Sequence, residues 1–158
     1  MLSAQVDDRK WVKPLKNCIK INFDASIGNN RTGCGVIVRD DDGFFFLGGG
    51  GGFKEIQLSI EEAEWYAFDE SIKIACRLNI KGDVLFKSDS AGLVNKINGQ
   101  KRDLTIIGEQ IKESIKAFVN FRSTTCIWTN QHCNSVANLI CKKMCVDACN
   151  WFFDMDYP

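Results

Sequence analysis

Apolar and polar residues alternate over residues 18–24, which is the period of a β-strand. Two further apolar runs, at 33–39 and 44–47, are joined by the turn-favouring sequence 40–43. This pattern predicts one strand followed by a β-hairpin. Five glycines follow at 48–52, and because glycine weakens a strand, we expect the third strand to fray or bulge there.

Apolar residues three or four positions apart predict helices in the rest of the chain. Ser59 and Glu62 have the spacing of a capping box, so a helix is expected to begin there and to end at residues 79–82. The other predicted elements are helices over 90–97, 104–118 and 134–149 and strands over 84–86 and 121–128.

The predicted element order is β-β-β-α-β-α-α-β-α. Strands joined by short turns should be antiparallel, and strands entered after helices should run parallel to the first. We therefore expect an α/β domain over residues 17–149, with a mixed sheet flanked by helices. Residues 1–16 are interpreted as an N-terminal tail and residues 150–158 as a C-terminal tail, whose aromatic residues 151–153 either pack back on the domain or dock a partner.

Composition narrows the class of protein. The 158 residues, 45% hydrophobic and 25% charged, suit one ordinary globular domain and exclude a disordered chain. Twenty basic residues balance twenty acidic ones, so no excess of positive charge is available for binding nucleic acid by bulk electrostatics. Any contact with nucleic acid must therefore be local.

No segment of the sequence predicts a membrane span or a secretion signal. The longest uncharged run, residues 43–53, is too short and too rich in glycine. Without a signal peptide, the eight cysteines are interpreted as free thiols of an intracellular protein, cytoplasmic or nuclear. Cys141, Cys145 and Cys149 span ~12 Å along one predicted helix, too far for all three to bind one zinc ion, so they are expected to pack as small hydrophobic side chains.

Three acidic residues fall where predicted elements converge. Asp24 lies near the end of the first strand, Asp89 directly follows the strand at 84–86, and Glu64 lies on the apolar stripe of its helix. A carboxylate on an apolar stripe is costly unless it is paired or binds a cation. Hard divalent cations prefer oxygen ligands. The alternatives are an ordinary strand-end aspartate and a partly exposed glutamate.

Six short motifs occur in order along the chain: W-x-x-P at 11–14, K-x-N-x-D at 20–24, G-V-x-x-R-D-x-x-G at 35–43, A-E at 63–64, S-D-S at 88–90 and N-S-V-A at 134–137. Together they resemble the ribonuclease H-like domain of plants, the reverse-transcriptase-like type related to retroelement ribonuclease H. The resemblance covers residues 11 to about 145. It implies a five-stranded mixed sheet of strand order 3-2-1-4-5, flanked by helices.

The resemblance also implies a nuclease that hydrolyses the RNA strand of RNA–DNA hybrids with two Mg²⁺ ions, or Mn²⁺ in their place. Asp24, Glu64 and Asp89 match the family's metal-binding acids. The fourth acid of the family falls at Asn138, which keeps a carbonyl oxygen but lacks the charge and is expected to be a weaker metal ligand. The alternative function is a catalytically degenerate domain that binds nucleic acid or protein. We expect a monomer.

Two further signals stay open at the sequence level. His132 is the only histidine; some ribonuclease H enzymes use a loop histidine for proton transfer or product release, and the alternative is an exposed loop residue. Trp65 and Trp128 are interpreted as core or rim aromatics rather than as platforms on which nucleic-acid bases stack.

Overall fold

The protein is described by a computed structural model that covers residues 18–42, 45–99 and 104–155. Its strands are β1 (Ile19–Gly28), β2 (Arg31–Arg39), β3 (Phe46–Lys54), β4 (Asp83–Ser88), β5 (Ser123–Trp128) and β6 (Trp151–Asp154). Its helices are α1 (Ile60–Arg77), α2 (Ala91–Asn98), α3 (Ile106–Ile115) and α4 (Ser135–Asp147), with 3₁₀ turns at Lys116–Asn120 and Gln131–Asn134. The predicted N-terminal tail and the W-x-x-P motif lie outside the described residues.

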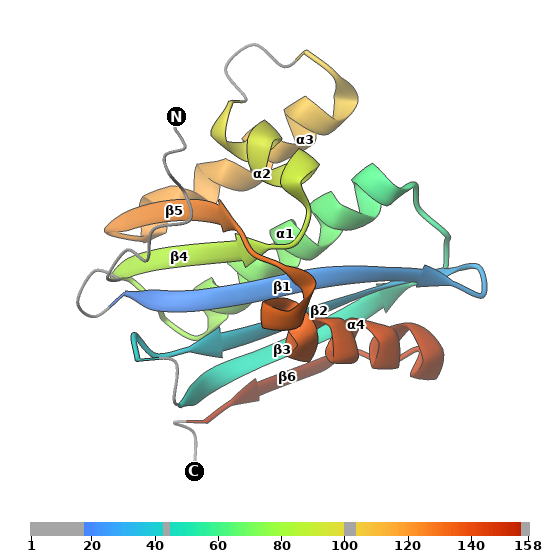
Figure 1. Cartoon of the computed structure of the whole chain (residues 1–158), viewed down its shortest axis with the longest axis horizontal. Coiled ribbons are helices and arrows are strands. Elements are labelled where there is room, and N and C mark those ends of the chain that lie inside the picture. The colour runs from blue at the N-terminus through green and yellow to red at the C-terminus, as the bar shows by residue number, and fades with distance from the viewer. Residues whose placement is uncertain (1–17, 43–44, 100–103, 156–158) are drawn as a thin grey trace.

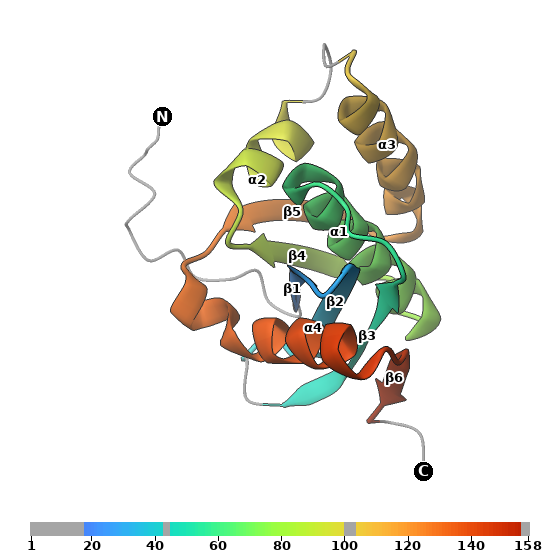
Figure 2. The same ribbon diagram turned by 90° about the vertical axis from the view of Figure 1, so that its right-hand side faces the viewer.

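The strands form one sheet in the order β5-β4-β1-β2-β3-β6, with helices on both faces (Figures 1 and 2). The first three strands are antiparallel, and β4 runs parallel to both β1 and β5. The predicted fold class and the order of the first five strands are thereby confirmed. Among the described residues, no helix combines the length and the apolar character that a membrane crossing requires.

The predicted number of five strands was wrong by one. Residues 151–154, expected in a tail, form β6 and pair antiparallel with β3, from Gly48 opposite Asp154 to Gly51 opposite Trp151. β3 itself runs through all five glycines. A register shift against Val38 and Arg39 of β2 leaves Leu47 of β3 as an extra residue directly before the glycine run. Gly48–Gly51 are paired with strands on both sides instead of fraying.

The main core lies between the sheet and α1. The predicted capping box starts this helix, because Ser59 Oγ accepts a hydrogen bond from the backbone N–H of Glu62 at 3.2 Å and donates one to Glu62 Oε1 at 3.1 Å. Phe68 of α1 packs against Phe23 and Phe86, with ring centroids 5.7 and 5.9 Å apart. The packing of these rings sets the distance between α1 and the strands β1 and β4.

Helix α4 covers β1, β2 and β3 on the opposite face of the sheet (Figure 2). The approach is close at Gly35 of β2, where an added Cβ would overlap the carbonyl oxygen of Ala137 in α4. Gly35 is the register partner of Asp24 in β1. The absence of a side chain at Gly35 therefore lets α4 lie directly beside Asp24.

Candidate active site

Asp24, Glu64 and Asp89 line one hollow, where α1 meets β1 and the end of β4. Asn22 of β1 pairs with Lys87 of β4, so Asp24 and Asp89 each lie two residues further along neighbouring parallel chains. Glu64 reaches the same hollow from the first turns of α1. The structure therefore brings together the three acids that the sequence singled out.

Electrostatics in the hollow disfavour three negative charges. Burial raises the pKa of Asp24, and the charge of Asp89 raises it further, against the hydrogen bond from Asn138, which lowers it. Burial also raises the pKa of Glu64, where the hydrogen bond with Ser90 has the opposite effect and the charges of Asp89 and Asp24 add to the rise. Bound positive charge would relieve both effects.

Asn138 lies beside Asp24 as a hydrogen-bond donor. Its Nδ2 donates to Oδ2 of Asp24 at 2.9 Å, and the backbone N–H of Ala25 donates to Oδ1 at 2.9 Å. An ionised carboxylate can only accept hydrogen bonds, so the amide presents its NH₂ group and turns its carbonyl oxygen away from Asp24. Both oxygens of Asp24 are thus held within the protein.

Two buried amides, which the sequence analysis did not single out as site residues, fix α4 to β1. Asn22 donates from Nδ2 to Oδ1 of Asn134 at 3.0 Å, and Asn134 donates from Nδ2 to the carbonyl oxygen of Phe23 at 3.0 Å. Asn134 is 1% exposed. Asn22 precedes Asp24 by two residues and Asn134 precedes Asn138 by one helical turn. These two hydrogen bonds therefore hold Asp24 opposite Asn138. In the sequence, the only indication of this pair was that Asn22 belongs to the K-x-N-x-D motif and Asn134 to the N-S-V-A motif.

The remaining predicted side chains lie away from the hollow. His132 is exposed in the 3₁₀ turn before α4 and does not line the hollow. Cys141 and Cys145 are buried, Cys149 is half-buried, and all three thiols are free. Their packing agrees with the expected role as small hydrophobic side chains.

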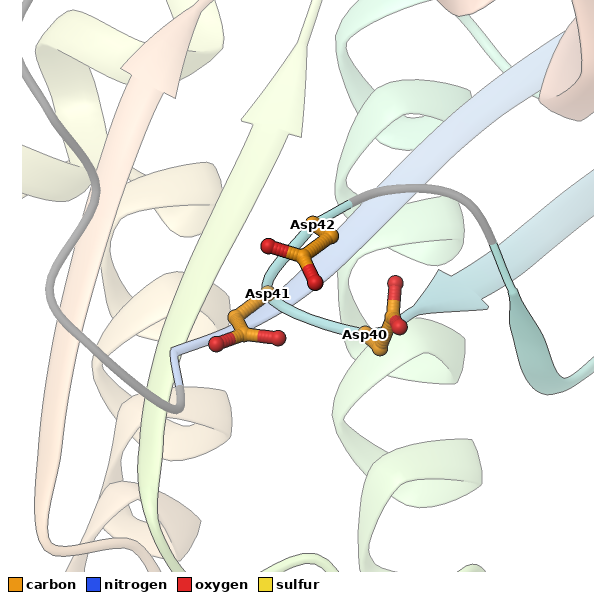
Figure 3. Close-up of side chains that lie close together, drawn as sticks. All are labelled: Asp40, Asp41 and Asp42. Carbon is orange, nitrogen blue, oxygen red and sulfur yellow. The ribbon is translucent and has the colours of Figure 1, made fainter.

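Three consecutive acids form a tighter group elsewhere (Figure 3). Within the described residues, only Asp40, Asp41 and Asp42 have carboxylate oxygens that all lie within 4.8 Å of one another. They occupy the turn after β2, and Oδ1 of Asp40 accepts a hydrogen bond from the backbone N–H of Phe45 at 3.3 Å. The acids of the hollow do not all lie within this distance of one another.

The sheet, with α1 on one face and α4 on the other beside an acidic hollow, defines a ribonuclease H-like fold. The chain belongs to the reverse transcriptase-like family, whose sequence model matches residues 22–144. No curated protein matches the chain.

Solved structures share the fold at low sequence identity. RNase H1 of the archaeon Halobacterium salinarum is 15% identical with a TM-score of 0.74, over 83% of this chain and 99% of that one. The N-terminal RNase H domain of a Mycobacterium tuberculosis protein, solved as a fusion with maltose-binding protein, is 16% identical with a TM-score of 0.74, over 84% and 96%. LC11-RNase H1, solved with an RNA/DNA hybrid, is 16% identical with a TM-score of 0.71, over 82% and 98%. These likenesses establish the fold.

Proposed function

We propose that this protein hydrolyses the RNA strand of RNA–DNA hybrids in a reaction that depends on divalent metal ions. The observation that carries the proposal is the hollow of the ribonuclease H-like fold, which three acids from β1, α1 and the end of β4 line together. The complex of LC11-RNase H1 with an RNA/DNA hybrid supports the choice of substrate.

The side chains of the hollow fit Mg²⁺ or Mn²⁺. Three carboxylates supply the oxygen ligands that hard cations prefer. Burial and the neighbouring acids raise the pKa values of Asp24 and Glu64, and bound cations would offset both effects. Asp24, Glu64 and Asp89 would hold the ions, and Asn138 would join them by presenting its carbonyl oxygen. Bound divalent ions supply charge that offsets the phosphate and makes water more acidic.

Hydrolysis would form a bond from a water oxygen to phosphorus and break the bond from phosphorus to the 3′ oxygen, leaving 5′-phosphate and 3′-hydroxyl ends. The chain contributes a fixed geometry to this step. Ala25 and Asn138 hold the carboxylate of Asp24, and Ser90 does the same for Glu64. His132, exposed on the turn before α4 and outside the hollow, would assist proton transfer or product release only once substrate extends from the hollow to this turn.

A second candidate function is binding of a hybrid without turnover. The hydrogen bond from Asn138 to Asp24 favours it, because the side chain at this position donates to the acid rather than adding a fourth negative charge. Loss of that charge weakens the attraction for a second ion.

Cleavage of a labelled hybrid in Mg²⁺ and in Mn²⁺ separates the two functions. The variants are Asp24→Asn, Asn138→Asp and, as the matched control, Asp40→Asn in the turn outside the hollow. Turnover is supported if the wild type and Asp40→Asn cleave and Asp24→Asn does not. Binding alone is supported if only Asn138→Asp cleaves. If all four proteins are folded and inert, these acids are not ligands of a catalytic metal.

A further inference from the structure

Trp128 is a large aromatic side chain, 54% exposed, that is hydrogen-bonded to the backbone of Asp89, a residue that lines the hollow. It is the last residue of β5 and the register partner of Ser88, the last residue of β4. Register partners on neighbouring strands place their side chains on the same face of a sheet. Ser88 lies two residues after Phe86, which packs against Phe68 of α1, so the indole lies on the α1 face of the sheet, at the strand ends where Ser88 lines the hollow.

The indole is anchored through its polar edge. Its Nε1 donates a hydrogen bond to the carbonyl oxygen of Asp89 at 3.2 Å, and the following backbone N–H, of Thr129, donates to the carbonyl oxygen of Ser88 at 2.8 Å. The exposed part of the side chain is therefore its apolar ring. A ring that is already held in place loses little conformational freedom when it binds a ligand.

The other described tryptophans are occupied by the protein. Trp65 packs against the core and donates from Nε1 to Ser114 Oγ at 2.9 Å. Trp151 stacks on Phe153 with a centroid separation of 4.6 Å, in β6 at the other edge of the sheet. Among the described residues, no aromatic ring stacks on Trp128. The exposed ring beside the hollow thus has room for an aromatic ligand.

We propose that Trp128 is a stacking platform for an unpaired nucleotide base beside the acidic hollow. Bases inside a duplex are covered on both faces by their neighbours, so only an unpaired or terminal base offers a free aromatic face. The inference rests on the proposed function for its ligand, nucleic acid. It adds that the site accepts a single-stranded segment, of RNA or of DNA, that adjoins a hybrid.

Binding measured by fluorescence anisotropy in EDTA tests this inference without any need for cleavage. The probes are a blunt RNA–DNA hybrid, the same hybrid with an unpaired RNA or DNA extension, and each extension as a free single strand. The variants are Trp128→Ala, Trp128→Phe and, as the matched control, Trp151→Ala, each checked for its melting temperature.

Trp128→Ala should lose about tenfold in affinity for the extended hybrids and the single strands, and much less for the blunt hybrid, which offers only its end pairs. Trp128→Phe, which keeps a ring but loses the donor to Asp89, should retain most of the affinity, and Trp151→Ala should match the wild type. The RNA and DNA extensions identify which strand supplies the base.

Three results would overturn the inference. Equal losses on blunt and extended hybrids would indicate a contact along the duplex. A Trp128→Phe variant as weak as Trp128→Ala would assign the effect to the hydrogen bond with Asp89. If the wild type binds none of the probes, nucleic acid is not a ligand of this protein and the inference fails. Absence of hybrid cleavage, in contrast, refutes only the proposed turnover, because the binding test contains no metal.

Discussion

Asn138 Nδ2 donates a hydrogen bond to Oδ2 of Asp24 at 2.9 Å, at the position where the resemblance places a fourth acid. This contact stabilises a negative charge that burial and Asp89 oppose. The amide of Asn138 therefore stabilises the metal-free protein, because it fixes the position of the Asp24 carboxylate when no ion is bound. It also leaves the hollow with one negative charge fewer for attracting ions.

Asn138→Asp should lower the stability of the metal-free protein and raise its response to metal. The substitution removes a hydrogen bond to a charged group, worth about 1.5–3 kcal/mol, and places two carboxylates side by side. Urea unfolding at pH 7 in EDTA and then in Mg²⁺ measures both effects. Asn138→Ala is the control, since it loses the hydrogen bond without gaining a charge and should respond to Mg²⁺ no more than the wild type.

Glu64→Gln should stabilise the metal-free protein at pH 7 by a few degrees in melting temperature. The pKa of Glu64 is raised in the folded state, so the folded protein holds this proton more tightly than the unfolded chain does. The stability that protonation contributes is present at low pH and is lost as the pH rises through the folded-state pKa. Glutamine keeps the oxygen that faces Ser90 and removes the charge.

The advantage of Glu64→Gln should shrink as the pH is lowered through the carboxyl range, as measured by melting temperatures in EDTA. Glu113→Gln, at an exposed position of α3, is the matched control. A constant gap between variant and wild type at every pH would contradict the assigned cause.

Gly35→Ala should destabilise the fold by about 1–3 kcal/mol, because the added methyl group meets the backbone of α4 at Ala137. Movement of α4 also carries Asn138 away from Asp24, so affinity for metal should change together with stability. Chemical denaturation and metal titration measure the two effects. Gly28→Ala, whose added Cβ has no atom within 4 Å, should behave as the wild type.

Asn22→Ala and Asn134→Ala should each cost about 1–3 kcal/mol, because each removes the hydrogen bond between the two buried amides. In Asn134→Ala, Asn22 Nδ2 keeps only its 3.3 Å bond to the carbonyl oxygen of Cys133. The double variant should cost less than the sum, since the second substitution removes the group that the first left unpaired. Asn22→Ala combined with Asn98→Ala, whose amide bonds instead to the carbonyl oxygen of Cys126, should be additive. Additivity in the Asn22/Asn134 pair would refute their coupling.

Local patterns in the sequence were sufficient for the acids and for most of the fold. Asp24 and Asp89 follow apolar strand residues, and Glu64 lies on a helical stripe that begins at a capping box; strand ends and helix faces are set by neighbours in the chain. The antiparallel and parallel pairings followed in turn from the short and long connections between the strands.

Contacts between distant segments account for what the sequence did not predict. β6 exists because β3 offers a free edge, far away in the chain. The donor role of Asn138 depends on the approach of α4 at Gly35, and the exposure of Trp128 depends on which helices cover the end of β5. None of these contacts leaves a periodic signal within its own segment.

The glycine run of β3 affects what determines the pairing register between β3 and β2. Shifting Gly48–Gly52 by one residue along β2 replaces one glycine by another, so no side chain within the run changes faces and the run does not select the register. Selection has to come from outside the run, through Leu47 against the core and through Phe152 and Phe153 of β6. Because β6 follows α4 and is far from β3 in the chain, this edge of the sheet is fixed only after β6 has been synthesised. A chain cut before Trp151 would leave β3 free to slip or to pair with a neighbouring molecule.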